Sequence, residues 1–236
     1  MDSLLTATVS LGFGFGLQHA LDPDHLVAIS TMVGEQKSIR RSSLMGTFWG
    51  MGHTAALLTV GLAVIISQQG IPPQMVTRLE MVVALMLVFL GVRTLRKSLA
   101  GWRLHRHRHQ HKNQAHAHFH LHQPGGETAG AQEHHSPLRV LLRPFLVGIV
   151  HGVAGSGALM LLVLSTVPSV SRQLFYIASF GVGSIAGMLA MSSAIGLPFV
   201  FTALRFENLN RFVQAGAGAF SVLFGCFLLW RHGIGG

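Results

Sequence analysis

Six apolar runs, each long enough to cross a lipid bilayer, constrain the fold of this chain more than any other feature. A membrane-spanning helix needs about 20 consecutive apolar residues. Only 11 % of the residues are charged, well below the roughly 25 % of soluble domains. The sequence therefore predicts an all-α, polytopic membrane protein with six transmembrane helices, near residues 4–33, 43–67, 74–95, 140–167, 173–203 and 209–230.

A polar segment divides these runs into two groups of three. We therefore expect a first three-helix half over 1–98, a His-rich loop over 99–137 and a second three-helix half over 138–236. Three helices per half bring the two halves into the membrane from opposite sides. The segments QHALDPDHLVAI (18–29) and VHGVAGSGALML (150–161) both place a histidine before a helix-weakening stretch and an aliphatic run. This pattern is typical of an inverted repeat with a site near the membrane midplane, although two unrelated Gly-rich helices would also produce it.

The distribution of positive charge predicts the orientation. Fourteen of the 17 lysines and arginines fall in or next to the first, third and fifth connections between the apolar runs. Such residues concentrate on the cytoplasmic side, so we expect the N-terminus outside and the central loop in the cytoplasm, in the cell (inner) membrane. The basic residues lie between apolar runs rather than on one helix face, which argues against a nucleic-acid partner and leaves membrane lipid as the surrounding partner.

The first apolar run contains four polar side chains that lipid does not accommodate. A carboxylate at the membrane centre costs about 2.5–3.5 kcal/mol on insertion scales, so two of them demand compensation. Residues three apart become neighbours on a helix, and Pro23 should clash with the carbonyl of His19, kink the helix and free that oxygen. Imidazoles and carboxylates together suit a divalent-metal site, with a proton relay or a structural His–Asp network as the alternative. The candidate residues are His19, Asp22, Asp24 and His25.

Two further histidines lie in apolar runs. They are His53 in FWGMGHTAAL (48–57) and His151 in GIVHGVAGSGAL (148–159). A lone histidine in a helix is more often a hydrogen-bonded packing residue than a ligand. Beside another buried histidine site, however, we expect His53 to complete the metal shell and His151 to line the path of the ion.

The central loop is rich in histidine. It reads HRHRHQHKNQAHAHFHLHQ at 105–123, and ten of the fifteen histidines lie between 105 and 135. Such a tract cannot form a core, and alternating imidazoles bind transition metals. The sequence predicts weak metal binding without fixed geometry, with a disordered basic linker as the alternative.

Two motifs of the sequence resemble those of a known family. HALDPDH (19–25) fits the His-x₄-Asp-His signature of the nickel/cobalt transporter family, with Pro23 where that family usually has alanine, and GMGHTAAL (50–57) resembles its second motif. The six runs and the absence of acidic residues from HGVAGSGAL and FGVGSIAGMLAMSSA resemble the short urease-accessory branch of nickel permeases. The resemblance implies metal handling by His19, Asp24, His25 and His53, with Asp22 as a close supporter.

The sequence thus predicts a transmembrane transporter of Ni²⁺ or Co²⁺, which is the transported substrate, with no organic cofactor and no enzymatic activity. The ATP-binding motif G-x-x-x-x-G-K-[ST] does not occur. One alternative is an accessory membrane protein that uses the loop to deliver metal to a cytosolic metallochaperone. Another is an intramembrane metalloenzyme, against which the lack of H-E-x-x-H argues. A homo-oligomer is left open.

Overall fold

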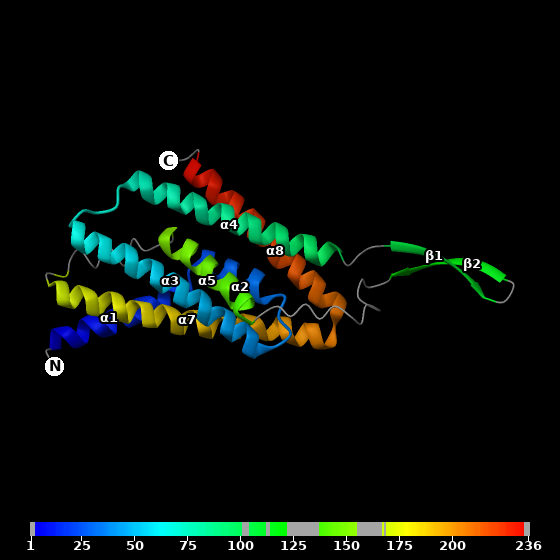
Figure 1. Ribbon diagram of the computed structural model, residues 1–236, viewed down its shortest axis with the longest axis horizontal. Helices are drawn as coiled ribbons and strands as arrows, with labels where there is room; N and C mark the ends of the chain where they lie inside the picture. Colours follow the sequence, from blue (N-terminus) through cyan, green and yellow to red (C-terminus); the bar gives the residue numbers. More distant parts are fainter. Residues whose placement is uncertain are drawn as a thin grey trace.

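The computed structural model describes residues 3–100, 104–111, 114–121, 137–154, 167 and 169–233 (Figure 1). Over these residues the apolar part of the chain is helical, as predicted, and two strands lie in the His-rich loop. The elements are α1 (Ser3–His19), α2 (Pro23–Val33), α3 (Ile39–Ser67), α4 (Pro73–Ala100), β1 (Leu104–His111), β2 (Gln114–Leu121), α5 (Pro137–Ala154), α7 (Val170–Arg205) and α8 (Glu207–Gly233).

Four of these helices, α3, α4, α7 and α8, are long and apolar enough to cross a membrane. The pair α1 and α2, bent by 58°, adds a fifth candidate if it forms one broken span. The predicted span 140–167 is described only in part, as α5, whose apolar portion Leu141–Val153 is shorter than a span. The chain is therefore a polytopic membrane protein, with up to five candidate spans in its described part against the six predicted.

The break between α1 and α2 lies where Pro23 predicted a kink. Pro23 is the first residue of α2, and Asp22 before it has φ −59° and ψ 142°. A residue before proline avoids the helical conformation, so the chain leaves α1 at His19 and restarts at the proline. One detail of the prediction is wrong: the carbonyl of His19 is not freed, because it accepts a hydrogen bond from the Asp22 N–H at 3.1 Å. The three-residue break supplies this donor in place of the missing proline N–H.

Helices of the two predicted halves pack across each other. The strongest pairings are α1 with α7, α3 with α5, α3 with α7, and α4 with α8. Figure 1 shows α2 and α5 in the middle of the helical bundle. Glycines allow the close approach: a Cβ on Gly148 of α5 would overlap the carbonyl oxygen of Trp49 on α3. Small residues at such crossings are the usual way for membrane helices to approach closely.

The buried core surrounds α2. It includes Ala28 and Ile29 of α2, Trp49 of α3, Leu87 of α4 and Met188 of α7. Large apolar side chains instead cover the outside of the helices, including Phe89, Phe212 and Leu223. An apolar outer surface is what helices in contact with lipid require, and polar side chains that do reach the interior lie among packed helices.

The His-rich loop forms a two-stranded antiparallel hairpin, which projects beyond one end of the helices in Figure 1. Weak metal binding by this loop without fixed geometry stays a prediction. Histidine alternates with other residues along both strands, and an alternation of period two matches a strand. In the register of the hairpin, His105 lies opposite His120, His107 opposite His118 and His109 opposite His116.

Candidate metal site

Four buried histidines from four helices converge at the break between α1 and α2. His19 ends α1, His25 lies in the first turn of α2, His53 lies within α3, and His151 lies in the last turn of α5. His19 is 6 % exposed and the other three are fully buried. The ring of His25 is central, because its centroid lies 4.5 Å from that of His19, 5.0 Å from that of His53 and 4.2 Å from that of His151.

Two of these histidine rings each have a carboxylate next to their Nδ1 atom. Nδ1 of His19 lies 2.8 Å from Oδ2 of Asp22, and Nδ1 of His25 lies 3.1 Å from Oδ1 of Asp24. A carboxylate on one ring nitrogen fixes the orientation of an imidazole that binds a metal through its other nitrogen. This arrangement favours the Nε2 atoms of His19 and His25 as ligand atoms.

The Nε2 atom of His53 lies next to the Nε2 atom of His19. It is 2.9 Å from Nε2 of His19, a hydrogen-bond distance, and two donors at 90° on a metal with bonds of about 2.1 Å would be separated by about 3.0 Å. His19, His25 and His53 can each offer one atom such that all three atoms lie within 4.8 Å of one another. These three histidines therefore form one possible metal-binding group.

Asp24 joins a second group. Its Oδ2 lies 2.8 Å from Nε2 of His151, while its Oδ1 is in contact with the ring of His25 and accepts a hydrogen bond from the backbone N–H of His25 at 3.0 Å. Asp24, His25 and His151 can also offer three ligand atoms within 4.8 Å of one another. Asp24 lies in the first turn of α2, where the helix dipole stabilises a negative charge.

Several buried nitrogen atoms of the cluster lack a hydrogen-bond partner in the described part of the chain. They are Nε2 of His25, Nδ1 of His53 and Nδ1 of His151. A buried polar atom without a partner costs about 1–3 kcal/mol, so three in one cluster indicate a site built for something else to bind. The charges agree with a divalent cation, since two carboxylates accompany imidazoles that bind metals in their neutral form.

The structure thus brings all six predicted residues, His19, Asp22, Asp24, His25, His53 and His151, to one place, and their role as metal ligands stays a prediction. Sequence reasoning missed Trp49, whose ring centroid lies 5.3 Å from that of His25 and 5.6 Å from that of His151. Its indole forms a wall of the cluster, and it is fully buried. Its position one helical turn before His53 was the available signal.

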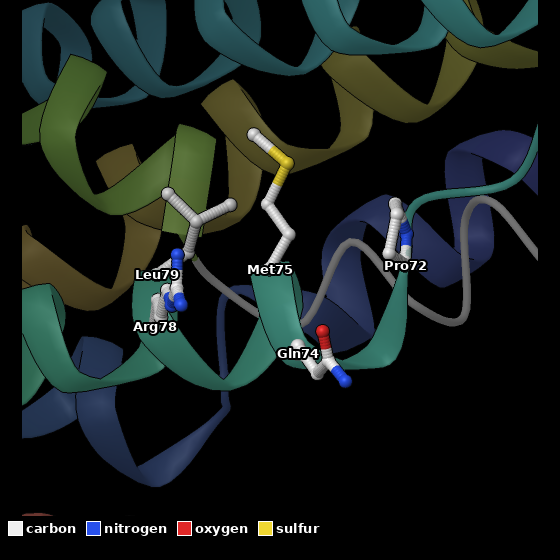
Figure 2. A pocket seen from close by; sticks show the side chains of 5 residues that line it. All are labelled: Pro72, Gln74, Met75, Arg78 and Leu79. Carbon is white, nitrogen blue, oxygen red and sulfur yellow. The ribbon is translucent and has the colours of Figure 1, made fainter.

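A separate hollow of about 440 Å³ lies at the start of α4. Figure 2 shows its lining residues, Pro72, Gln74, Met75, Arg78 and Leu79, and none of the six predicted metal residues is among them. The hollow belongs to the connection between α3 and α4, so it is distinct from the buried histidine cluster.

Comparison with known proteins gives two matches. The NicO family, described as high-affinity nickel-transport protein, matches residues 5–207. The urease accessory protein UreH of Bacillus sp. (strain TB-90) is 35 % identical over 230 residues, which cover 98 % of this chain and 93 % of that protein. No solved structure matches the chain. The family is one of transporters rather than enzymes, which agrees with the prediction from the motifs. The chain is a member of the NicO family of nickel-transport proteins.

Proposed function

We propose that this protein carries Ni²⁺, and less effectively Co²⁺, across the cell membrane through the histidine cluster at the α1–α2 break. The observation that carries the proposal is the convergence of His19, His25 and His53, which can each offer one ligand atom within 4.8 Å of the others, beside two carboxylates in a chain of apolar helices. Membership of a nickel-transport family supports the choice of ion.

The donor set explains the choice of metal. Imidazole suits nickel, cobalt and zinc, whereas sites of carboxylate and water suit magnesium and manganese. The two anions, Asp22 and Asp24, offset the charge of the ion in a place where lipid surrounds the helices. The break at Pro23 gives α1 and α2 a hinge, and discontinuous helices at the midplane are the usual setting of ion sites in transporters.

The proposed topology follows the charge distribution. The termini lie outside, the two three-helix halves form an inverted repeat, and the His-rich loop lies in the cytoplasm. Because α1 packs on α7 of the second half and α5 packs on α3 of the first, the cluster draws His19, His25 and His53 from one half and His151 from the other. Movement of the halves against each other would open the site alternately to the two sides.

Metal uptake into proteoliposomes tests the function. We expect saturable uptake of Ni²⁺, slower uptake of Co²⁺ and little uptake of Mn²⁺ above empty liposomes. Zn²⁺ should compete with Ni²⁺ for uptake, because a site of three imidazoles also suits zinc. The measurement is the metal content of washed vesicles after timed exposure, with both protein orientations present. Uptake of none of the four ions above empty liposomes would contradict the proposal.

Delivery of metal to a cytosolic partner is the second candidate function, and the register of the hairpin favours it. Three pairs of histidines lie opposite each other on β1 and β2. The same uptake assay on a variant with the loop histidines changed to glutamine separates the two functions at unchanged loop length. A carrier keeps most of its uptake into liposomes, whereas a protein that acts only by delivery shows no uptake with or without these histidines.

A further inference from the structure

We propose that the histidine cluster holds two alternative positions for the transported ion, which share the ring of His25, and that Ser184 of α7 belongs to the second position. The first position consists of His19, His25 and His53, and the second of Asp24, His25 and His151 together with Ser184. This inference rests on the proposed transport function and adds to it how the ion passes through the cluster.

The ring of His25 belongs to both groups of possible ligand atoms. Nδ1 lies 3.1 Å from Oδ1 of Asp24, whose other oxygen is 2.8 Å from Nε2 of His151. Nε2 of His25 is buried and has no hydrogen-bond partner among the described residues. The ring of His25 also lies next to the rings of His19 and His53. An imidazole can bind a metal through either nitrogen, so one ring serves both positions without leaving its place.

The two positions are filled in turn rather than together. The ring centroids of the four histidines lie 4.2–5.9 Å apart in every pair that involves His25 or His53. Two divalent ions in so small a buried volume repel each other strongly, because little water is present to screen them. The second ligand group is therefore a second stop for the same ion.

Helix packing relates the two positions to each other. A Cβ on Gly16 of α1 would overlap the carbonyl oxygen of Phe180 on α7, and a Cβ on Gly148 of α5 would overlap that of Trp49 on α3. In both cases the nearest backbone nitrogen belongs to the residue four positions later, which is Ser184 in the first case and His53 in the second. The α1–α7 contact and the α5–α3 contact thus share one geometry.

The glycines on α7 and α3 make the corresponding contacts with α1 and α5. A Cβ on Gly183 of α7 would overlap the carbonyl oxygen of Phe13 on α1, and a Cβ on Gly52 of α3 would overlap that of Phe145 on α5. These contacts relate α1 to α5 by one offset, in which Gly16 corresponds to Gly148 and Phe13 to Phe145, and relate α3 to α7 by an offset one residue shorter, in which Gly52 corresponds to Gly183. Such a correspondence is what an inverted repeat produces, since the first helix of each half then packs on the second helix of the other.

Under this correspondence His19 and His151 are equivalent, because each lies three residues after its glycine. Their surroundings agree: the ring of His19 lies 5.4 Å from that of Phe180, and the ring of His151 lies 5.6 Å from that of Trp49. One histidine of each half therefore lies on each side of His25. We infer that His19 holds the ion in one orientation of the carrier and His151 holds it in the other.

The same correspondence makes Ser184 the counterpart of His53. Ser184 is fully buried, and its hydroxyl has no hydrogen-bond partner within the described ranges. A buried hydroxyl without a hydrogen-bond partner is uncommon and indicates that a ligand binds there. Since His53 stands beside His19 in the first position, the correspondence assigns Ser184 to the second position with His151, and its oxygen would there bind the ion or a water molecule on it.

Single variants of the full-length protein separate the two positions, with Co²⁺ as the spectroscopic probe and the loop histidines changed to glutamine throughout. His53→Gln should leave only the second position, and His151→Gln only the first. We expect each to bind one Co²⁺ per chain within about tenfold of the parent affinity, with visible spectra that differ from each other. Both should lose at least tenfold in maximal transport rate, because the ion can no longer change position.

A single shared metal shell predicts a different result. Both variants would then lose Co²⁺ affinity together, which would overturn the two-position arrangement, as would an unchanged transport rate of His151→Gln. If the parent protein transports no metal at all, the proposed function fails, while the binding affinities and spectra still decide between one position and two.

Ser184→Ala tests the second position directly. In the His53→Gln background it should shift the Co²⁺ spectrum, and in the His151→Gln background it should leave the spectrum unchanged. Ser192→Ala is the matched control, because Ser192 is also fully buried on α7 and its hydroxyl donates a hydrogen bond to the Leu189 carbonyl at 3.1 Å. A spectrum that Ser184→Ala leaves unchanged in both backgrounds would remove Ser184 from the site.

Discussion

The His25→Ala variant should lose saturable Ni²⁺ uptake, with a transport rate about 100-fold or more below that of the wild-type protein. His25 is fully buried and belongs to both groups of ligand atoms. Loss of an outer partner of a metal ligand already lowers affinity by about 10–100-fold, and loss of a shared ligand should lower it further. The measurement is initial Ni²⁺ uptake into proteoliposomes over a range of Ni²⁺ concentrations.

His232→Ala provides the matched control for this experiment. His232 lies on α8, and its Nδ1 is 3.1 Å from Oε2 of Glu80 on α4, outside the cluster. It should transport at the wild-type rate. Uptake by His25→Ala at half of the wild-type rate or more, with equal amounts of folded protein in the vesicles, would contradict the role of the cluster.

The Asp24→Asn variant should raise the Ni²⁺ concentration at half-maximal uptake by about tenfold or more, because the loss of even an outer-shell partner lowers metal affinity by about 10–100-fold. The carboxylate of Asp24 contacts the rings of both His25 and His151. An asparagine keeps the size of the side chain but has one acceptor oxygen and no charge, so it can orient only one of the two rings and no longer offsets the charge of the ion.

Glu80→Gln is the matched control for Asp24→Asn. It makes the same carboxylate-to-amide change on α4, where Glu80 pairs with His232. Its concentration dependence should equal that of the wild-type protein. An Asp24→Asn curve that overlaps the Glu80→Gln curve would show that the carboxylate does not act on the ion.

The local part of the site could be predicted from the sequence. His19, Asp22, Asp24 and His25 lie within seven residues, and Pro23 marks the break between them, so their proximity depends only on helix geometry and proline chemistry. The same reasoning erred on the His19 carbonyl, because it treated the helix as continuous through the proline. A break of three residues brought the Asp22 N–H to that oxygen instead.

The long-range part could not be derived from local patterns. Asp24 of α2 and His151 of α5 are 127 residues apart and lie in contact at 2.8 Å, and Gly148 lets α5 approach the backbone of α3. Ser184 carries no sequence signal of a metal site, and the only signal for Trp49 is its position one helical turn before His53. Their roles depend on which helices pack together, which a pattern along one segment does not contain.

X-ray absorption at the nickel K-edge tests the central claim most directly. The sample is the purified protein with its loop histidines changed to glutamine and one Ni²⁺ bound per chain, so that any histidine signal comes from the helices. We expect outer-shell scattering from at least two imidazoles, lost in the His25→Ala variant. A nickel ion surrounded by oxygen alone would contradict a site within the membrane helices, and an imidazole signal left unchanged by His25→Ala would contradict a site that is centred on His25.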